Sequence, residues 1–195
     1  MRCKKENFVE GEYFHIYNRT ISPFKLFIDR DDYLWFLDKF TKTLKLYPAT
    51  VFAFCLMPNH FHFLVRQDSD VAIYRNFNDS FSSYVRHYNF KYKRKGSLFE
   101  GALQHINIYQ DSHFINLCKY IHYNPKKANL VSVLEDWEFS NYLEWIGKRK
   151  SMLFEDKILN DLFFCPEDYR DTILEYERFI QVEKFNRLLI DYFES

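Results

Sequence analysis

The chain of 195 residues has the length of one domain with an appendage, and its 27 basic and 27 acidic side chains leave no formal net charge. Four glycines and five prolines exclude a long flexible or low-complexity design, and the four scattered cysteines form no CxxC pair typical of a zinc ribbon. No apolar run approaches the length of a membrane span, and the first residues lack a signal-peptide pattern. We therefore expect a soluble cytoplasmic protein with reduced thiols.

The zero net charge conceals an asymmetry along the chain. Residues 1–130 carry 19 Lys and Arg against 12 Asp and Glu, whereas residues 131–195 carry 8 against 15. A basic body with an acidic appendage fits a domain that binds a polyanion, although two differently charged surfaces would give the same counts. We predict two parts, a catalytic or binding domain over residues 1–130 and a mainly helical extension over residues 131–195.

Hydrophobic periodicity predicts strands and helices in the order β-α-β-β-α-β, followed by a further helix. The strands are expected over residues 11–20, 50–57, 60–66 and 102–109, and the helices over about 29–46, 70–92 and 111–123. Asp68 to Asp70 are expected to cap the second helix and Pro125 to stop the third. In the extension we expect an irregular or short helical segment over 137–146 and helices over about 154–164, 166–180 and 183–193. This order matches an α+β fold of the ferredoxin-like split βαβ type, with an antiparallel four-stranded sheet and helices on one face.

Two histidines lie in the second strand of the predicted hairpin, VFAFCLMPNHFHFLVR (residues 51–66). Successive strand side chains point to opposite faces, so His60 and His62 face the same way and Phe61 faces the other. Two imidazoles on one face of a sheet can bind a divalent metal, although a bare His-x-His is more often a pair of half-buried strand histidines. In the first strand the same alternation places Tyr13, His15 and Tyr17 on one face.

The third predicted helix carries a tyrosine and an amide on one face. Tyr120 and Asn124 are four residues apart, with Asn116 one turn earlier. An amide oxygen can be a third ligand of a hard divalent ion, and a phenol beside that ion is a potential nucleophile. Tyr123 is the competing candidate, about 60° away around the helix.

Basic and aromatic side chains alternate where the second helix ends, in YVRHYNFKYKRKGSLFEG (residues 84–101). The 22 Phe and 15 Tyr of the chain can build a core or stack on unpaired bases. The segment suits a phosphate-backbone surface, and a solvated helix end would also explain it. Its basic side chains are Arg86, His87, Lys91, Lys93, Arg94 and Lys95.

These motifs together resemble the HUH single-tyrosine transposases, and more closely their REP-associated tyrosine transposase branch. The resemblance rests on PNHFHFLV after Met57 and on YIHYNPKKANLV, in which Tyr120 precedes Asn124 and Pro125. DWEFSNYLEWIG (residues 136–147) is similar to the Trp-Ser-Ser-Tyr segment of the branch, with Asn141 in place of the second serine. The similarity covers residues 13–147. One departure is Arg19-Thr20, where the branch usually has Arg-Gly.

The resemblance implies metal-assisted transesterification of single-stranded DNA that carries hairpins, through a 5′-phosphotyrosine on Tyr120. His60, His62 and Asn124 would hold Mg²⁺ or Mn²⁺, and zinc at the same place is an alternative. Family members act as a monomer or as a homodimer. Two other functions stay open, a hairpin-binding protein without strand transfer and a metal-dependent phosphoesterase that has no need of Tyr120. The candidate DNA-binding residues are Arg19, Arg86, Lys91, Lys93, Arg94, Lys95, Lys126 and Lys127.

Overall fold

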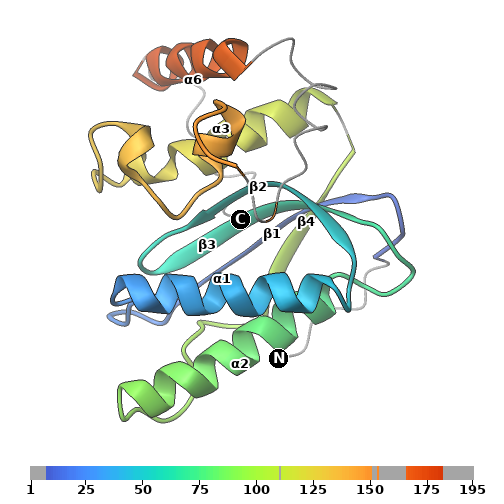
Figure 1. Cartoon of the computed structure of the whole chain (residues 1–195), viewed down its shortest axis with the longest axis vertical. Coiled ribbons are helices and arrows are strands. Elements are labelled where there is room, and N and C mark those ends of the chain that lie inside the picture. The colour runs from blue at the N-terminus through green and yellow to red at the C-terminus, as the bar shows by residue number, and fades with distance from the viewer. Residues whose placement is uncertain (1–7, 110, 151–152, 154–165, 182–195) are drawn as a thin grey trace.

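A four-stranded antiparallel sheet lies between two layers of helices in the computed structural model (Figure 1), which describes residues 8–109, 111–150, 153 and 166–181. The strands lie in the order β2-β3-β1-β4. They are β1 (Tyr13–Arg19), β2 (Ala49–Leu56), β3 (His60–Gln67) and β4 (Gln104–Ile108). In the described part of the chain no helix is long and apolar enough to cross a lipid bilayer.

The helices α1 (Arg30–Leu44) and α2 (Tyr74–Lys91) cover one face of the sheet. This arrangement confirms the predicted α+β fold of the ferredoxin-like type, because both crossover helices lie on the same side and β2 and β3 form a hairpin. The helix α3 (Asp111–Lys127) packs on the opposite face, and α6 (Pro166–Gln181) lies outside α3 (Figure 1). The predicted helix over 166–180 corresponds to α6, whereas those over 154–164 and 183–193 fall outside the described residues.

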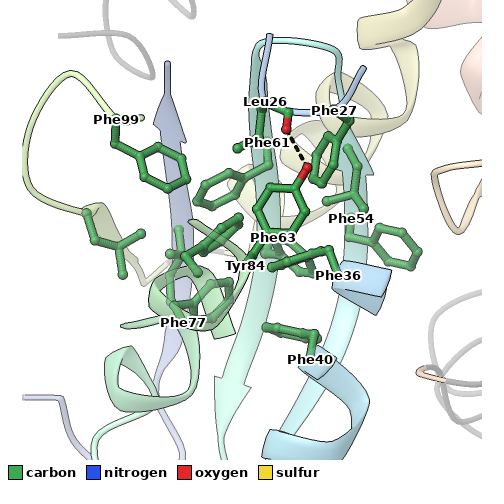
Figure 2. Close-up of a cluster of buried hydrophobic side chains, with 14 of the residues drawn as sticks. Leu26, Phe27, Phe36, Phe40, Phe54, Phe61, Phe63, Phe77, Tyr84 and Phe99 are labelled. Carbon is green, nitrogen blue, oxygen red and sulfur yellow. Dashed lines mark hydrogen bonds between the residues drawn. The ribbon is translucent and has the colours of Figure 1, made fainter. Parts of the chain in front are cut away.

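Phenylalanine side chains fill the space between the sheet and the α1–α2 layer (Figure 2). Phe61 and Phe63 of β3 point into it, with Phe61 stacked on Phe81 at a centroid distance of 4.2 Å and Phe63 at 4.8 Å from Phe40. Tyr84 donates a buried hydrogen bond of 2.6 Å to the Leu26 carbonyl. Many of the aromatic side chains therefore form the core. Phe61, which lies between the two histidines in the sequence, packs into this core on the face of β3 opposite to them.

The start of α2 differs from the prediction. The helix begins at Tyr74, and no side chain of its N-cap residue bonds to the helix end. Instead the Gln67 side-chain oxygen accepts from the Ile73 amide at 2.9 Å. Asp68, expected to cap α2, accepts from Arg66 Nε and from Thr50 Oγ1, both at 2.6 Å. The expected cap was wrong because Asp68 is held by the β2–β3 pair.

The prediction that Pro125 stops α3 was also wrong. The helix continues through Pro125 to Lys127. A proline lacks the N–H that would bond to the carbonyl four residues earlier, here that of Ile121. The Asn124 amide group donates to the Tyr120 carbonyl at 2.9 Å and approaches the Ile121 carbonyl at 3.5 Å. The Asn124 side chain thus approaches the one carbonyl that loses its helical donor, that of Ile121, and the helix extends past the proline to Lys127.

The segment after α3 covers the outer edge of β2. It contains a 3₁₀ turn, η1 (Leu134–Asp136), and the short helix α4 (Tyr142–Trp145), as the expectation of an irregular or short helical segment implied. Ser140 forms a bridge with Cys55, and the Leu56 amide donates to the Phe139 carbonyl at 2.8 Å. An edge strand covered in this way has few open backbone groups for another chain.

Candidate metal and nucleophile site

The strand register brings the polar side chains of three strands together on the face toward α3. Tyr17 of β1 lies opposite His62 of β3 on one side and opposite Gln104 of β4 on the other. Two residues further along the same two strands, and on the same face of the sheet, Arg19 lies opposite His60. A cavity of about 460 Å³ opens over this part of the sheet, and its lining includes Arg19, His60 and His62.

The two histidines of the His-x-His motif lie side by side, as predicted. Their ring centroids are 5.2 Å apart and the ring planes are inclined by 78°. His60 Nδ1 is 2.8 Å from the side-chain oxygen of Asn59. Because an amide oxygen only accepts, Nδ1 of His60 carries the proton and Nε2 keeps its lone pair. His62 is more deeply buried, and its Nδ1 lies 3.0 Å from Nε2 of His15.

Burial keeps these imidazoles neutral. It lowers the pKa of His60 to about 4, an effect that a hydrogen bond with Asn124 opposes. The positive charges of Lys127 and Arg19 lower the pKa of His60 further. Burial also lowers the pKa of His62 well below its usual value, with His15 and His60 adding to the shift. Neutral imidazole is the form that binds a metal. Both rings are in this uncharged form at neutral pH.

Asn124 completes a set of three potential metal ligands. Its amide nitrogen donates to the Tyr120 carbonyl at 2.9 Å, and the side chain lies close enough to His60 to influence the pKa of that imidazole. The set therefore offers two imidazole nitrogens and one amide oxygen, which are chemically suited to a divalent ion. Within the described residues, no cluster of three His, Cys, Asp or Glu side chains could hold a metal.

Tyr120 lies beside the two histidines. Its ring is edge-on to His62, with centroids 5.4 Å apart and planes inclined by 77°. The Lys127 ammonium lies 5.4 Å from the centre of the Tyr120 ring. The tyrosine, the amide and the two histidines, selected from the sequence as one site, thus occupy one place in the fold.

Tyr123 points to the other side of α3. Its ring packs edge-on against Tyr176 of α6, with centroids 5.8 Å apart. Burial raises the pKa of the Tyr123 phenol, and so do the charge of Glu177 and a hydrogen bond to that carboxylate. The competing nucleophile is therefore engaged with α6 and turned away from the histidines.

A buried histidine of α3, His122, links the helix to α6 on one side and to Asn141 on the other. His122 Nδ1 lies 2.7 Å from the Tyr169 hydroxyl of α6, and His122 Nε2 lies 2.9 Å from the Asn141 side-chain oxygen. That oxygen also accepts from the Phe54 amide of β2 at 2.7 Å. Since the Asn141 oxygen only accepts, His122 carries its proton on Nε2 and accepts from Tyr169 at Nδ1. Asn141 thus ties α3 to the sheet.

Of the predicted DNA-binding cations, the structure brings Arg19 and Lys127 to the histidines. Arg19 borders the cavity and forms an ion pair with Glu100, which lines the same cavity. Lys126, in contrast, forms an ion pair of 2.7 Å with Glu177 of α6. Adjacent lysines of α3 therefore have different environments, one at the site and one at the α6 contact.

The remaining cations lie at the C-terminal end of α2, and two of them have partners that hold the fold together. Lys91 contacts Asp29 and the buried Asp32, both at 2.8 Å. Arg94 lies 4.1 Å from the ring centre of Phe24 and donates to backbone carbonyls of the following loop. Arg86, Lys93 and Lys95 are exposed, and no acidic side chain of the described residues pairs with them.

Sequence analysis did not assign His15, Asn59, Gln104 or Glu100 to the site. Alternation in the first strand placed His15 and Tyr17 on one face, but only the register with β3 brings them to His62. Asn59 precedes the motif directly and could have been found as a hydrogen-bond partner of His60. Glu100 comes from a loop whose path no local pattern indicates.

The chain belongs to the family of IS200-like transposases, whose family model matches residues 9–124. A Haemophilus influenzae protein named as a REP-associated tyrosine transposase is 29% identical over 118 residues, which are 55% of this chain and 66% of that protein. The solved structure of a REP-associated tyrosine transposase bound to a REP hairpin shares the fold with a TM-score of 0.59 at 16% identity. That match covers 80% of this chain and 98% of the other. The family expected from the motifs is confirmed.

Proposed function

We propose that this chain is a tyrosine transposase that cleaves single-stranded DNA next to a hairpin and rejoins the strands through Tyr120. The observation that carries the proposal is the edge-on contact of Tyr120 with His62, with Tyr123 turned toward α6. Family membership and the REP hairpin in the related solved structure support DNA as the substrate.

In the proposed reaction the Tyr120 oxygen attacks the scissile phosphorus. A bond forms between the phenol oxygen and the 5′-phosphate, the bond to the 3′-oxygen breaks, and that oxygen leaves as a 3′-OH after taking up a proton. The phenol loses its own proton in the same step. The Lys127 ammonium near the ring favours the developing phenolate. Because the covalent link retains the phosphodiester energy, a DNA 3′-OH can reverse the step without ATP.

His60, His62 and Asn124 would hold Mg²⁺ or Mn²⁺. When bound, such an ion neutralises charge on the non-bridging oxygens of the scissile phosphate. The chain prepares the site by keeping both imidazoles neutral and by orienting the Asn124 side chain through its bond to the Tyr120 carbonyl. Imidazole ligands also suit zinc, so metal identity is decided by titration with each ion.

We assign Arg19 and Lys127 to DNA phosphates at the site, because Arg19 lies opposite His60 and borders the cavity and the Lys127 ammonium lies 5.4 Å from the centre of the Tyr120 ring. Arg86, Lys93 and Lys95 offer a second exposed basic surface at the end of α2. We leave Lys91, Arg94 and Lys126 out of this assignment, since acidic or backbone groups of the chain already engage them.

Covalent trapping tests this proposal. Labelled single-stranded DNA with a hairpin is incubated with the protein and Mn²⁺, and the products are separated on a denaturing gel. We expect a protein–DNA adduct that disappears in Tyr120→Phe, in His60→Ala and with a chelator, and that persists in Tyr123→Phe. Binding of the hairpin without any adduct would instead indicate a binding protein. DNA cleavage that persists in Tyr120→Phe would indicate a phosphoesterase.

A further inference from the structure

His15 is a buried histidine that the proposed chemistry does not use. Its side chain is 0% exposed, and its Nε2 lies 3.0 Å from His62 Nδ1. The two rings are stacked, with centroids 5.2 Å apart and planes inclined by 18°. The backbone of His15 lies opposite Leu64, so its contact with His62 runs diagonally between neighbouring strands.

The contact between the two rings permits only two proton arrangements. A hydrogen bond between two ring nitrogens needs one N–H donor and one lone-pair acceptor, so a single proton lies between His15 Nε2 and His62 Nδ1, which are 3.0 Å apart. If His62 donates, its Nδ1 carries the proton and its Nε2 has a lone pair. If His15 donates, His62 carries its proton on Nε2, and that nitrogen cannot bind a metal.

We propose that His15 is a positioning residue that accepts the Nδ1 proton of His62 and so directs the Nε2 lone pair toward the metal position. The inference rests on the proposed metal site of His60, His62 and Asn124. Asn59 gives His60 the same Nδ1-protonated form through its side-chain oxygen at 2.8 Å, so both ligands are prepared alike. Metal-binding histidines generally donate their second ring N–H to a fixed acceptor. An imidazole acceptor performs this task without burying a negative charge.

The first test is the tautomer of His62 in metal-free protein, read from long-range ¹H–¹⁵N NMR spectra of the histidine rings. We expect the Nδ1-protonated form in the wild type. His15→Phe removes the acceptor, and the His62 signals should move to the Nε2-protonated form or to a mixture. His15→Gln offers a side-chain oxygen near the position of Nε2 and should restore the wild-type pattern.

The second test is Mn²⁺ binding, measured by electron paramagnetic resonance on the same proteins. Loss of such an orienting partner typically weakens metal binding by about 10–100-fold, and we expect this for His15→Phe with recovery to within a few-fold in His15→Gln. His87→Phe is the matched control, because His87 stacks on Trp35 in the α1–α2 layer and should bind Mn²⁺ like the wild type. Backbone amide spectra establish that each variant is folded.

The outcomes separate this inference from the proposed function. An Nε2-protonated His62 in the wild type would overturn the role of His15, as would a His15→Phe protein with unchanged tautomer and Mn²⁺ affinity. The tautomer is read without metal or DNA. A chain that forms no DNA adduct but shows the expected tautomers and Mn²⁺ affinities would therefore refute the transposase proposal and support His15.

Discussion

Replacing Asn141 by alanine removes the side chain that joins the tyrosine helix to the sheet. The Asn141 side chain is fully buried and makes three hydrogen bonds. Its oxygen accepts from the Phe54 amide at 2.7 Å and from His122 Nε2 at 2.9 Å, and its nitrogen donates to the Phe52 carbonyl at 2.8 Å. We expect Asn141→Ala to destabilise the protein strongly and to loosen α3.

The magnitude follows from the groups that lose their partners. The Phe52 carbonyl still accepts from Trp145 Nε1 at 2.7 Å, so only two donors, the Phe54 amide and His122 Nε2, become unsatisfied. Each buried unsatisfied group costs about 1–3 kcal/mol, which gives roughly 2–6 kcal/mol for the pair. The free energy of unfolding of a typical domain is about 5–15 kcal/mol, so the loss is a large share of the total.

Urea unfolding followed by tryptophan fluorescence measures this loss. With a slope of about 2 kcal/mol per molar urea, the midpoint should fall by roughly 1–3 M. Asn107→Ala is the control, because that half-buried side chain makes one bond of 3.3 Å to Glu12 and should change stability by about 0.5 kcal/mol or less. A loss below about 1 kcal/mol in Asn141→Ala would refute the reasoning that this amide holds α3 to β2.

Two further predictions concern pH and DNA affinity. Burial lowers the pKa of His122 to about 4, below the value of about 6.5 in an unfolded chain. The contribution of neutral His122 to the free energy of unfolding is therefore fully present above pH 6.5. It is lost as the pH falls toward 4, and the loss is about 2 kcal/mol at pH 5. The pH dependence of urea unfolding should be weaker by this amount in His122→Gln, and an identical dependence would contradict the assignment. Glu100→Gln removes the carboxylate that pairs with Arg19 and should tighten hairpin DNA binding about 3–10-fold at low salt, with a smaller effect at high salt. Fluorescence anisotropy measures this change, and unchanged or weaker binding would argue against Arg19 as a phosphate contact.

The parts of the site that sequence analysis found depend on short-range periodicity. His60 and His62 share a face because strand side chains alternate, and Tyr120 and Asn124 share one because a helix turns about every 3.6 residues. The hairpin at Pro58-Asn59 and the order of elements also follow from local signals. These features do not require knowledge of which strands pair.

The features that sequence analysis missed depend on tertiary contacts. The place of His15 beside His62 requires the β1–β3 register, and the partners of Lys91 require that α2 end near the start of α1. Pro125 lies inside α3, where the Asn124 side chain approaches the Ile121 carbonyl at 3.5 Å, an interaction that helix-breaking rules do not include. The contact of Tyr123 with Tyr176 likewise depends on the position of α6.

The most direct test of the central claim is to locate the DNA-linked tyrosine by mass spectrometry. The adduct formed with hairpin DNA and Mn²⁺ is digested with nuclease and trypsin, which yields the peptide YIHYNPK (residues 120–126) with both candidate tyrosines. Fragmentation then shows which phenol carries the remaining nucleotide. We predict that the nucleotide is on Tyr120. A nucleotide on Tyr123, or cleaved DNA without any modified peptide, would contradict the proposed nucleophile.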